Sequence, residues 1–335
     1  NNTSPETFSP GDCVTLTNCD IDDALNIKRR SGYGAPVVAG VDRDLWSSGP
    51  VCLAVGSNAL KQIMPDYSTI TLRSGLTANR PLAYAVVQDR VYYSNGVETG
   101  CVQNGASRSW GLTPPALPLA TATGGALRAG RYQFVVTYLR ADMQESGAVR
   151  AGVIDLTDTG GISLTAIPVS SDPSVGYKVI YLSTTSPDDK TLYRVGVIAN
   201  ATTEFVIREP VTTAVPLMTQ FLGPPPAGDY IGYHGGIMLV ASGNRLYPSE
   251  AYAPELFDVR KSIPLLDRVT MIAPVDDGVW VGTDSQVLWL GGETPDKWSY
   301  KDVSGYGVIP GTAVETDGEV MGDGSGKGSP VWLFA

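Results

Sequence analysis

The sequence predicts an all-β protein, and three observations support that class. Glycine (38) and proline (24) are frequent and occur in short bursts between apolar runs, as in proteins with many strands and turns. Apolar residues make up 43% of the 335 residues, enough for a full hydrophobic core. Stretches rich in Ala, Glu, Lys and Leu, which favour helices, are nearly absent.

A loose repeat predicts the architecture. Residues 82–96 read as an apolar strand, a polar turn and a second apolar strand that ends at Ser-Asn-Gly. The same plan recurs in 231–243 and 271–284, which continue into third strands at 245–247 and 286–290, and more weakly in 45–60 and 313–334.

The spacing of these units is regular. Positions 46 and 84, 233 and 272, and 272 and 313 each lie about 40 residues apart. A period near 40 with three or four short antiparallel strands per unit is typical of a β-propeller blade. The alternative is a set of unrelated hairpins, which any β-rich chain can produce.

The repeat is interrupted between about residues 112 and 225. Proline clusters in 111–118 and 222–229 flank the interruption, and prolines at this density stop ladders and stiffen linkers. About seven short strands without a Cys…Trp…Cys spacing predict an Ig-like or fibronectin type III-like β-sandwich. The predicted domains are therefore 1–111 (propeller, first part), 112–225 (inserted sandwich) and 226–335 (propeller, second part).

The first forty residues differ from the repeat. They alternate polar and apolar positions and carry the basic cluster Lys28-Arg29-Arg30. They read as a long edge hairpin, and they could supply the strand that closes the propeller on the C-terminal half-blade. The basic triplet is interpreted as a solvated face.

Charge argues against one class of function. The net charge is −10, from 34 acidic and 24 basic residues, which disfavours a protein that binds nucleic acid by neutralising phosphates. Acidity keeps a large surface soluble, and in a protein that lines a conduit it would also let DNA pass without sticking. No apolar run approaches the ~20 residues of a membrane span.

Metal sites are also disfavoured. The chain has four cysteines (Cys13, Cys19, Cys52 and Cys101), no C-x-x-C pair and one histidine, His234, so no zinc site of the usual kind is expected. Free thiols are favoured over a Cys13–Cys19 link. The cluster Asp20, Asp22 and Asp23 lacks the glycine and glutamate of a calcium loop.

No arrangement predicts catalysis. His234 lies in a Tyr-His-Gly-Gly turn, and the glycine-rich segment 322–329 lacks phosphate-loop spacing. The pairs Asp276/Asp277 and Asp188/Asp189 fall in turns, where aspartate caps the backbone. Recurrent strand aromatics are attributed to blade packing rather than to a sugar-stacking surface; they are Trp46, Tyr84, Tyr92, Tyr93, Trp280, Trp289 and Trp332. We therefore predict a non-enzymatic protein with no catalytic, cofactor-binding or metal residues.

The opening of the chain resembles a family of tailed-bacteriophage virion proteins. An N-x-D-I-D … R-R-x-G-Y pattern carries the resemblance through Asn18, Asp20, Ile21, Asp22, Arg29, Arg30, Gly32 and Tyr33. Residues 81–96 and 108–118 are similar to the family's first blade hairpin and its exit into an inserted domain. Residues 130–148 are similar to its sandwich strand, with Asp142, Glu145, Ser146 and Gly147 in the expected turn.

The resemblance implies a structural function. Propeller-plus-sandwich proteins of this kind are similar to nozzle proteins at the distal end of short phage tails, although the larger nozzles are longer and carry extra domains. The expected function is a ring, six copies being the family expectation, that gates or lines the DNA ejection conduit. Expected partners are other tail proteins such as an adaptor or tail fibres, with genome DNA only in passing. The expected location is the virion tail, assembled in the host cytoplasm.

Two other classes stay open. A phage adhesin or carbohydrate-binding propeller that contacts the host surface is the main alternative. A glycoside hydrolase propeller is the third, disfavoured because the repeated S-x-D-x-G-x-T-W turn of sialidase propellers is missing.

Overall fold

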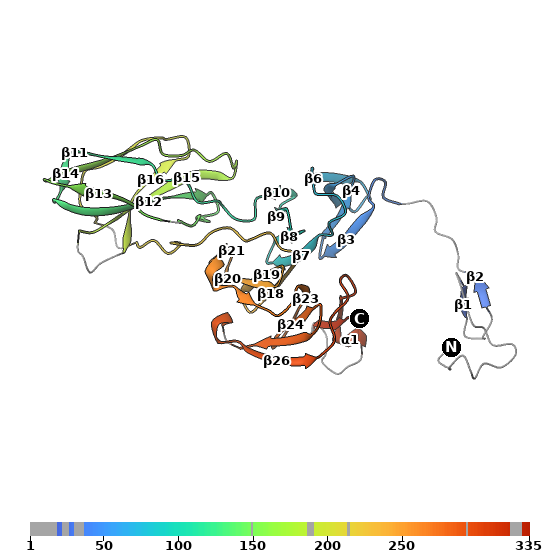
Figure 1. The fold of residues 1–335 in the computed structure, drawn as a ribbon. Helices are drawn as coiled ribbons and strands as arrows, with labels where there is room; N and C mark the ends of the chain where they lie inside the picture. Colours follow the sequence, from blue (N-terminus) through green and yellow to red (C-terminus); the bar gives the residue numbers. More distant parts are fainter. Residues whose placement is uncertain are drawn as a thin grey trace.

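The structure is a computed structural model that describes residues 19–21, 27–29, 37–148, 150–185, 191–212, 215–292, 294–321 and 330–335. It is almost entirely β (Figure 1), with one short α-helix, α1 (Gly318–Met321), in the described part. The all-β prediction is confirmed. No helix in this part of the chain is long and apolar enough to cross a membrane.

Two four-stranded antiparallel sheets begin the body of the molecule. Sheet 1 contains β3 (Arg43–Ser48), β4 (Val51–Gly56), β5 (Ala59–Ile63) and β6 (Thr69–Arg73), in that order. Sheet 2 contains β7 (Ala83–Val87), β8 (Arg90–Ser94), β9 (Thr99–Gln103) and β10 (Ala106–Arg108).

Two more sheets follow later in the sequence. Sheet 3 contains β18 (Tyr230–His234), β19 (Ile237–Ser242), β20 (Arg245–Glu250) and β21 (Ala253–Phe257), with β22 (Ile263–Pro264) also on β20. Sheet 4 contains β23 (Val269–Val275), β24 (Gly278–Thr283), β25 (Val287–Gly291) and β26 (Ser299–Ser304). Their strand positions match the hairpins predicted from the repeat.

Tight turns connect the strands of two of these hairpins. Two-residue turns with positive φ at both positions join β4 to β5 (Ser57 and Asn58) and β18 to β19 (Gly235 and Gly236). Such type I′ turns match the right-handed twist of paired strands, and they favour Asn and Gly because these residues tolerate positive φ.

The four sheets pack face against face. Leu53 and Val55 of sheet 1 share a buried cluster with Tyr93 of sheet 2. Equivalent clusters join sheet 2 to sheet 3 and sheet 3 to sheet 4. Successive small antiparallel sheets that bury their faces against neighbours agree with a propeller-like β fold.

The last predicted unit is smaller than the others. In the described part of 313–334 there are only two strands, β27 (Val314–Asp317) and β28 (Pro330–Leu333), which pair with each other. We call them the C-terminal sheet. They lie against sheet 4, where the indole of Trp332 donates a hydrogen bond to the carbonyl of Pro274 at 2.9 Å.

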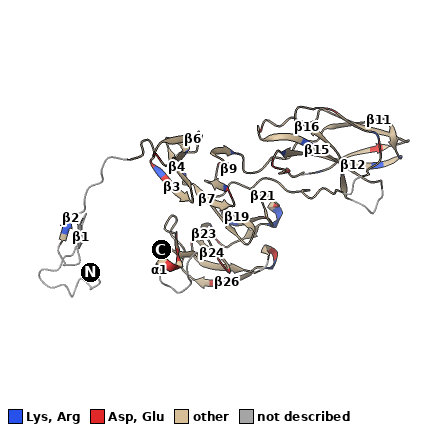
Figure 2. Cartoon of the chain, turned by 180° about the vertical axis from the view of Figure 1, so that it is seen from behind, with Lys and Arg blue, Asp and Glu red and all other residues tan. Residues whose placement is uncertain are grey.

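A second two-stranded sheet lies near the N-terminus. Strands β1 (Cys19–Ile21) and β2 (Ile27–Arg29) form this N-terminal sheet and, among the described strands, pair only with each other. Figures 1 and 2 show it apart from the other sheets. The expected closure of the propeller by this segment is therefore not seen within the single chain.

Seven strands between β10 and β18 form two sheets of their own. One contains β11 (Leu119–Leu127), β14 (Gly160–Thr165) and β17 (Phe205–Ile207); the other contains β13 (Gly152–Leu156), β12 (Gly130–Arg140), β15 (Val175–Ser183) and β16 (Leu192–Ala199). Ile162 and Ile207 of the first share a buried cluster with Phe134 and Ile180 of the second. We call this part the insert; its Ig-like class and the limits 112–225 stay predictions.

Candidate functional site

A large cavity lies between sheets 1 to 4 and the C-terminal sheet, which together we call the body. Its volume is about 1210 Å³, and it is bordered by β3, β7, β18, β23 and the C-terminal sheet. In each of sheets 1 to 4, the strand that comes first in the sequence borders the cavity. The blades of a propeller likewise each present one strand to the central channel.

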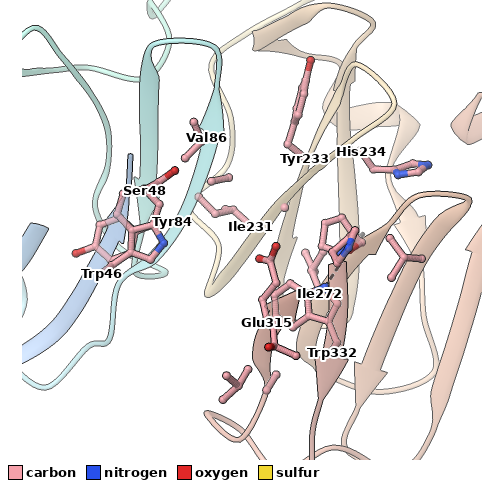
Figure 3. Close-up of a pocket in the computed structure, with 18 of the residues that line it drawn as sticks. Trp46, Ser48, Tyr84, Val86, Ile231, Tyr233, His234, Ile272, Glu315 and Trp332 are labelled. Atoms are coloured by element: carbon pink, nitrogen blue, oxygen red, sulfur yellow. Dashed lines mark hydrogen bonds between the residues drawn. The ribbon is translucent and has the colours of Figure 1, made fainter. Parts of the chain in front are cut away.

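Aromatic side chains form part of the cavity wall. Trp46 and Tyr84 stack with ring centroids 5.0 Å apart, and Figure 3 shows them across the cavity from Trp332. Tyr233 adds a fourth aromatic ring to the lining. These residues come from four different sheets, so only the folded chain brings them together.

Acidic side chains also line the cavity. Asp276 lies in the turn after β23, and Glu315 and Asp317 belong to β27. The surrounding walls raise the pKa of Glu315 because they remove water from its carboxylate. His234 lies at the same cavity, but Figure 3 shows its ring pointing away from Glu315. The cavity therefore offers aromatic faces and carboxylates, without a paired acid and base.

Exposed side chains lie on two sides of the opening of this cavity. The strands β7, β18 and β23 have mostly covered side chains, whereas β3 has an exposed face that includes Leu45 at 71% exposure. On the other side of the opening, Val314 of β27 is 57% exposed. Sheet 1 and the C-terminal sheet thus carry exposed apolar side chains beside the cavity.

A partly buried ion cluster forms a second notable site. We call Arg90, Arg108, Arg140, Asp142 and Glu255 the junction cluster. The Glu255 carboxylate accepts hydrogen bonds from Arg140 at 3.0 Å, Arg90 at 3.1 Å and Arg108 at 3.3 Å. Arg90 and Arg108 belong to sheet 2, Glu255 to sheet 3 and Arg140 to the insert, so this cluster ties three parts of the chain together.

The central pair of the cluster, Glu255 and Arg140, is buried. The side chains of Glu255 and Arg140 are each 1% exposed. Burial raises the pKa of Glu255 above its ordinary value, and the three guanidinium groups oppose that shift. The Tyr92 hydroxyl donates a further hydrogen bond to Glu255 at 3.0 Å, so the carboxylate is held on several sides.

The outer part of the cluster reaches the loops of the insert. Asp142 accepts hydrogen bonds from Arg108 at 2.9 Å and from Arg90 at 3.1 Å. Arg140 also donates to the carbonyl of Ser109 at 2.9 Å, next to the proline-rich exit into the insert. Each charged side chain of the cluster forms an ion pair with another of its members, although the Nε atoms of Arg90 and Arg108 have no hydrogen-bond partner.

Several residues considered for chemistry lie in turns or outside the described part. His234 ends β18, and Asp276 with Asp277 forms the turn between β23 and β24. Asp22, Asp23, Asp188, Asp189 and the glycine-rich segment 322–329 lie outside the described residues, as does Cys13. Among the described residues, no group of three or more His, Cys, Asp or Glu side chains could hold a metal ion.

Packing accounts for part of the aromatic set. Tyr92 and Tyr93 are fully buried, whereas Trp46, Tyr84 and Trp332 line the cavity. Cys52 and Cys101 are free thiols, and burial raises the pKa of Cys101 to about 11.

Sequence reasoning missed the junction cluster. Apart from Arg140 and Asp142, its members are far apart in the sequence, and all but Asp142 lie in ordinary strands, so no spacing pattern marks them. The available signal was indirect: Arg108 lies just before the first proline cluster, where a joint between domains was expected.

Neither a protein-family model nor a curated protein sequence matches the chain. Among solved structures it is similar to AztD from Citrobacter koseri, with 13% identity and a TM-score of 0.18 over 80% of this chain and 87% of that chain. It is also similar to PorZ, a surface component of the type-IX secretion system of Porphyromonas gingivalis, with 11% identity and a TM-score of 0.17. That match covers 86% of this chain and 43% of PorZ. TM-scores this low carry no argument about fold or function.

Proposed function

We propose that this chain is a non-enzymatic structural component of a bacteriophage tail, nozzle-like, that forms a homo-oligomeric ring around the DNA ejection conduit. The observation that carries the proposal is the exposed apolar surface of β3 and the C-terminal sheet, where Leu45 and Val314 lie beside the cavity. Open sheet edges and exposed apolar side chains are sites of association, which a structural subunit uses for assembly.

The connection between insert and body supports a mechanical role. A subunit that transmits or resists force needs its parts fixed to one another. The buried pair Arg140–Glu255 and the hydrogen bond that Arg140 donates to the Ser109 carbonyl at 2.9 Å join these parts. We infer a propeller carrying an inserted Ig-like or fibronectin type III-like sandwich, with the insert at 112–225.

The charge of the chain suits a conduit for DNA. A net charge of −10 would repel phosphates and let the genome pass without binding. In this proposal the subunits contact one another and other tail proteins, such as an adaptor or fibres, in a virion assembled in the host cytoplasm. The ring has six copies if it follows the family it resembles.

Mass photometry of the purified chain over a concentration series tests the assembly. The expected result is a single closed oligomer whose mass is a fixed multiple of the 35.4 kDa chain. A chain that stays monomeric at every concentration, with its fold intact by circular dichroism, would contradict the proposal.

The aromatic cavity favours one other function, a carbohydrate-binding module that contacts the host surface. Aromatic faces next to carboxylates are a common arrangement for sugar rings, which stack on the former and donate hydrogen bonds to the latter. A glycan array tests this alternative with the native chain and a Trp46→Ala variant, using Trp289→Ala outside the cavity as the matched control. Binding that is lost only with Trp46→Ala would favour the adhesin, and absence of binding would remove it.

A further inference from the structure

Two incomplete sheets of this chain have complementary properties. The C-terminal sheet has two strands, whereas sheets 1, 2 and 4 have four each. The N-terminal sheet also has two strands and, among the described strands, no other partner. Two-stranded sheets are marginally stable alone, and their open edges favour pairing with further strands.

The C-terminal sheet has an exposed apolar surface. Five large apolar side chains in and next to this sheet are more than 40% exposed: Val314 and Leu333 of its strands, Phe334 after β28, and Val320 and Met321 of α1. Apolar side chains gathered in this way mark an interaction surface. On the N-terminal sheet, Ile27 is 57% exposed and can cover part of it.

The charges of the two sheets are opposite at their exposed edges. Residues 305–321 carry Glu315, Asp317 and Glu319 and no lysine or arginine. Strand β2 carries Lys28 and Arg29; Lys28 lies opposite Asp20 in the register, while Arg29 lies opposite the uncharged Cys19. Figure 2 shows the basic β2 and the acidic region around α1 as separate coloured patches.

We propose that the N-terminal sheet of one copy pairs with the C-terminal sheet of a second copy and completes a four-stranded blade there. This inference rests on the proposed ring and names the contact that joins its subunits. The exchanged strands contribute main-chain hydrogen bonds at the sheet edge, and Arg29 meets the acidic edge that contains Glu315.

The length of the segment between β2 and β3 does not decide whether the N-terminal sheet pairs within its own chain or with a second copy. Residues 30–42 join β2 to β3 and span at most about 45 Å when fully extended, enough to approach the C-terminal sheet of the same chain. The single chain nevertheless leaves both sheets unpaired with each other. We therefore assign the pairing to neighbouring copies, and closure within one chain is an outcome of the test.

Disulfide trapping between two differently tagged copies tests the pairing. One copy carries Ile27→Cys and the other Val314→Cys, both with Cys13, Cys19 and Cys52 replaced by serine; Cys101 is fully buried and stays. The expected product on oxidation is a covalent pair that contains both tags. Val153→Cys on β13 of the insert, 47% exposed, replaces Val314→Cys as the matched control and should give none.

A third chain that carries both Ile27→Cys and Val314→Cys separates the outcomes. Covalent ladders support exchange between copies, and a link within single chains alone overturns it. Rings that assemble without either link overturn this inference and leave the proposed ring standing. A chain that stays monomeric and unlinked removes the proposed function as well.

A charge reversal gives an independent readout. Glu315→Arg places like charges together and should weaken assembly about two- to fivefold, and Arg29→Glu in the same chain should restore it. Equal assembly of Glu315→Arg and the native chain would contradict the pairing of these edges. Glu315 also lines the cavity, so circular dichroism of both variants checks that the fold is kept.

Discussion

Replacing Glu255 by glutamine should loosen the joint between the body and the insert. The Glu255 carboxylate and the Arg140 guanidinium are 3.0 Å apart and each 1% exposed, so the variant leaves a buried cation without its main anion. Breaking a buried pair in this way costs about 3–5 kcal/mol of unfolding free energy. Arg140 keeps Asp172 at 3.6 Å and other partners, which places the expected cost at about 3 kcal/mol, the lower end.

Urea unfolding followed by tryptophan fluorescence measures this cost, and hydrogen exchange locates it. Amides of β10, β12 and β21 should exchange faster in Glu255→Gln, since these strands carry the junction cluster. Glu250→Gln is the matched control: its partner Lys261 is 61% exposed, so about 0–1 kcal/mol is expected. An equal loss of unfolding free energy in both variants would contradict this prediction. Fast exchange in sheet 4 and not at the joint would contradict it as well.

Three further predictions concern the packing and charge of the same body. Trp110→Ala should cost about 3–5 kcal/mol, because the ring is 1% exposed between sheets 2 and 3; Trp110→Phe should cost less, and equal urea midpoints would contradict this. Gly56→Ala should destabilise sheet 1 by about 1–3 kcal/mol, because the added Cβ would lie 1.7 Å from the carbonyl oxygen of Gly40; an unchanged melting temperature would show that the chain relaxes freely. Acidification should weaken the joint, because the pKa values of Asp142 and Asp172 lie below the ordinary value of 3.8. Burial would raise both pKa values, but hydrogen bonds from Arg108 to Asp142 and from serine hydroxyls to Asp172 lower them further than burial raises them. Ionised carboxylates of this kind stabilise the fold above about pH 4, and that stability is lost as the pH falls through their lowered pKa values, so exchange at β12 should rise in that range.

The strand positions could be predicted from the sequence because the information is local. Alternating apolar residues and short Gly or Asn turns specify hairpins such as β7–β8 and β18–β19 without help from distant contacts. The size of the last unit could not be predicted in the same way. Residues 313–334 carry the apolar pattern of a blade, but the segment offers only two described strands, and a full blade would need strands from elsewhere.

The functional sites depended on contacts between distant residues. Glu255 lies 115 positions from Arg140, and a lone glutamate in a strand gives no sign that three arginines will surround it. The cavity aromatics were recognised as a set, but their division between core and cavity wall depends on which face of each strand turns inward. A shift by one residue exchanges those faces, and only the packed sheets decide it.

Electron cryomicroscopy of the assembled full-length chain tests the central claim most directly. The account predicts a closed ring of identical subunits whose lumen is lined by acidic side chains and is wide enough for duplex DNA to pass. Separate monomers, or a ring whose lumen is neutral or basic, would contradict it.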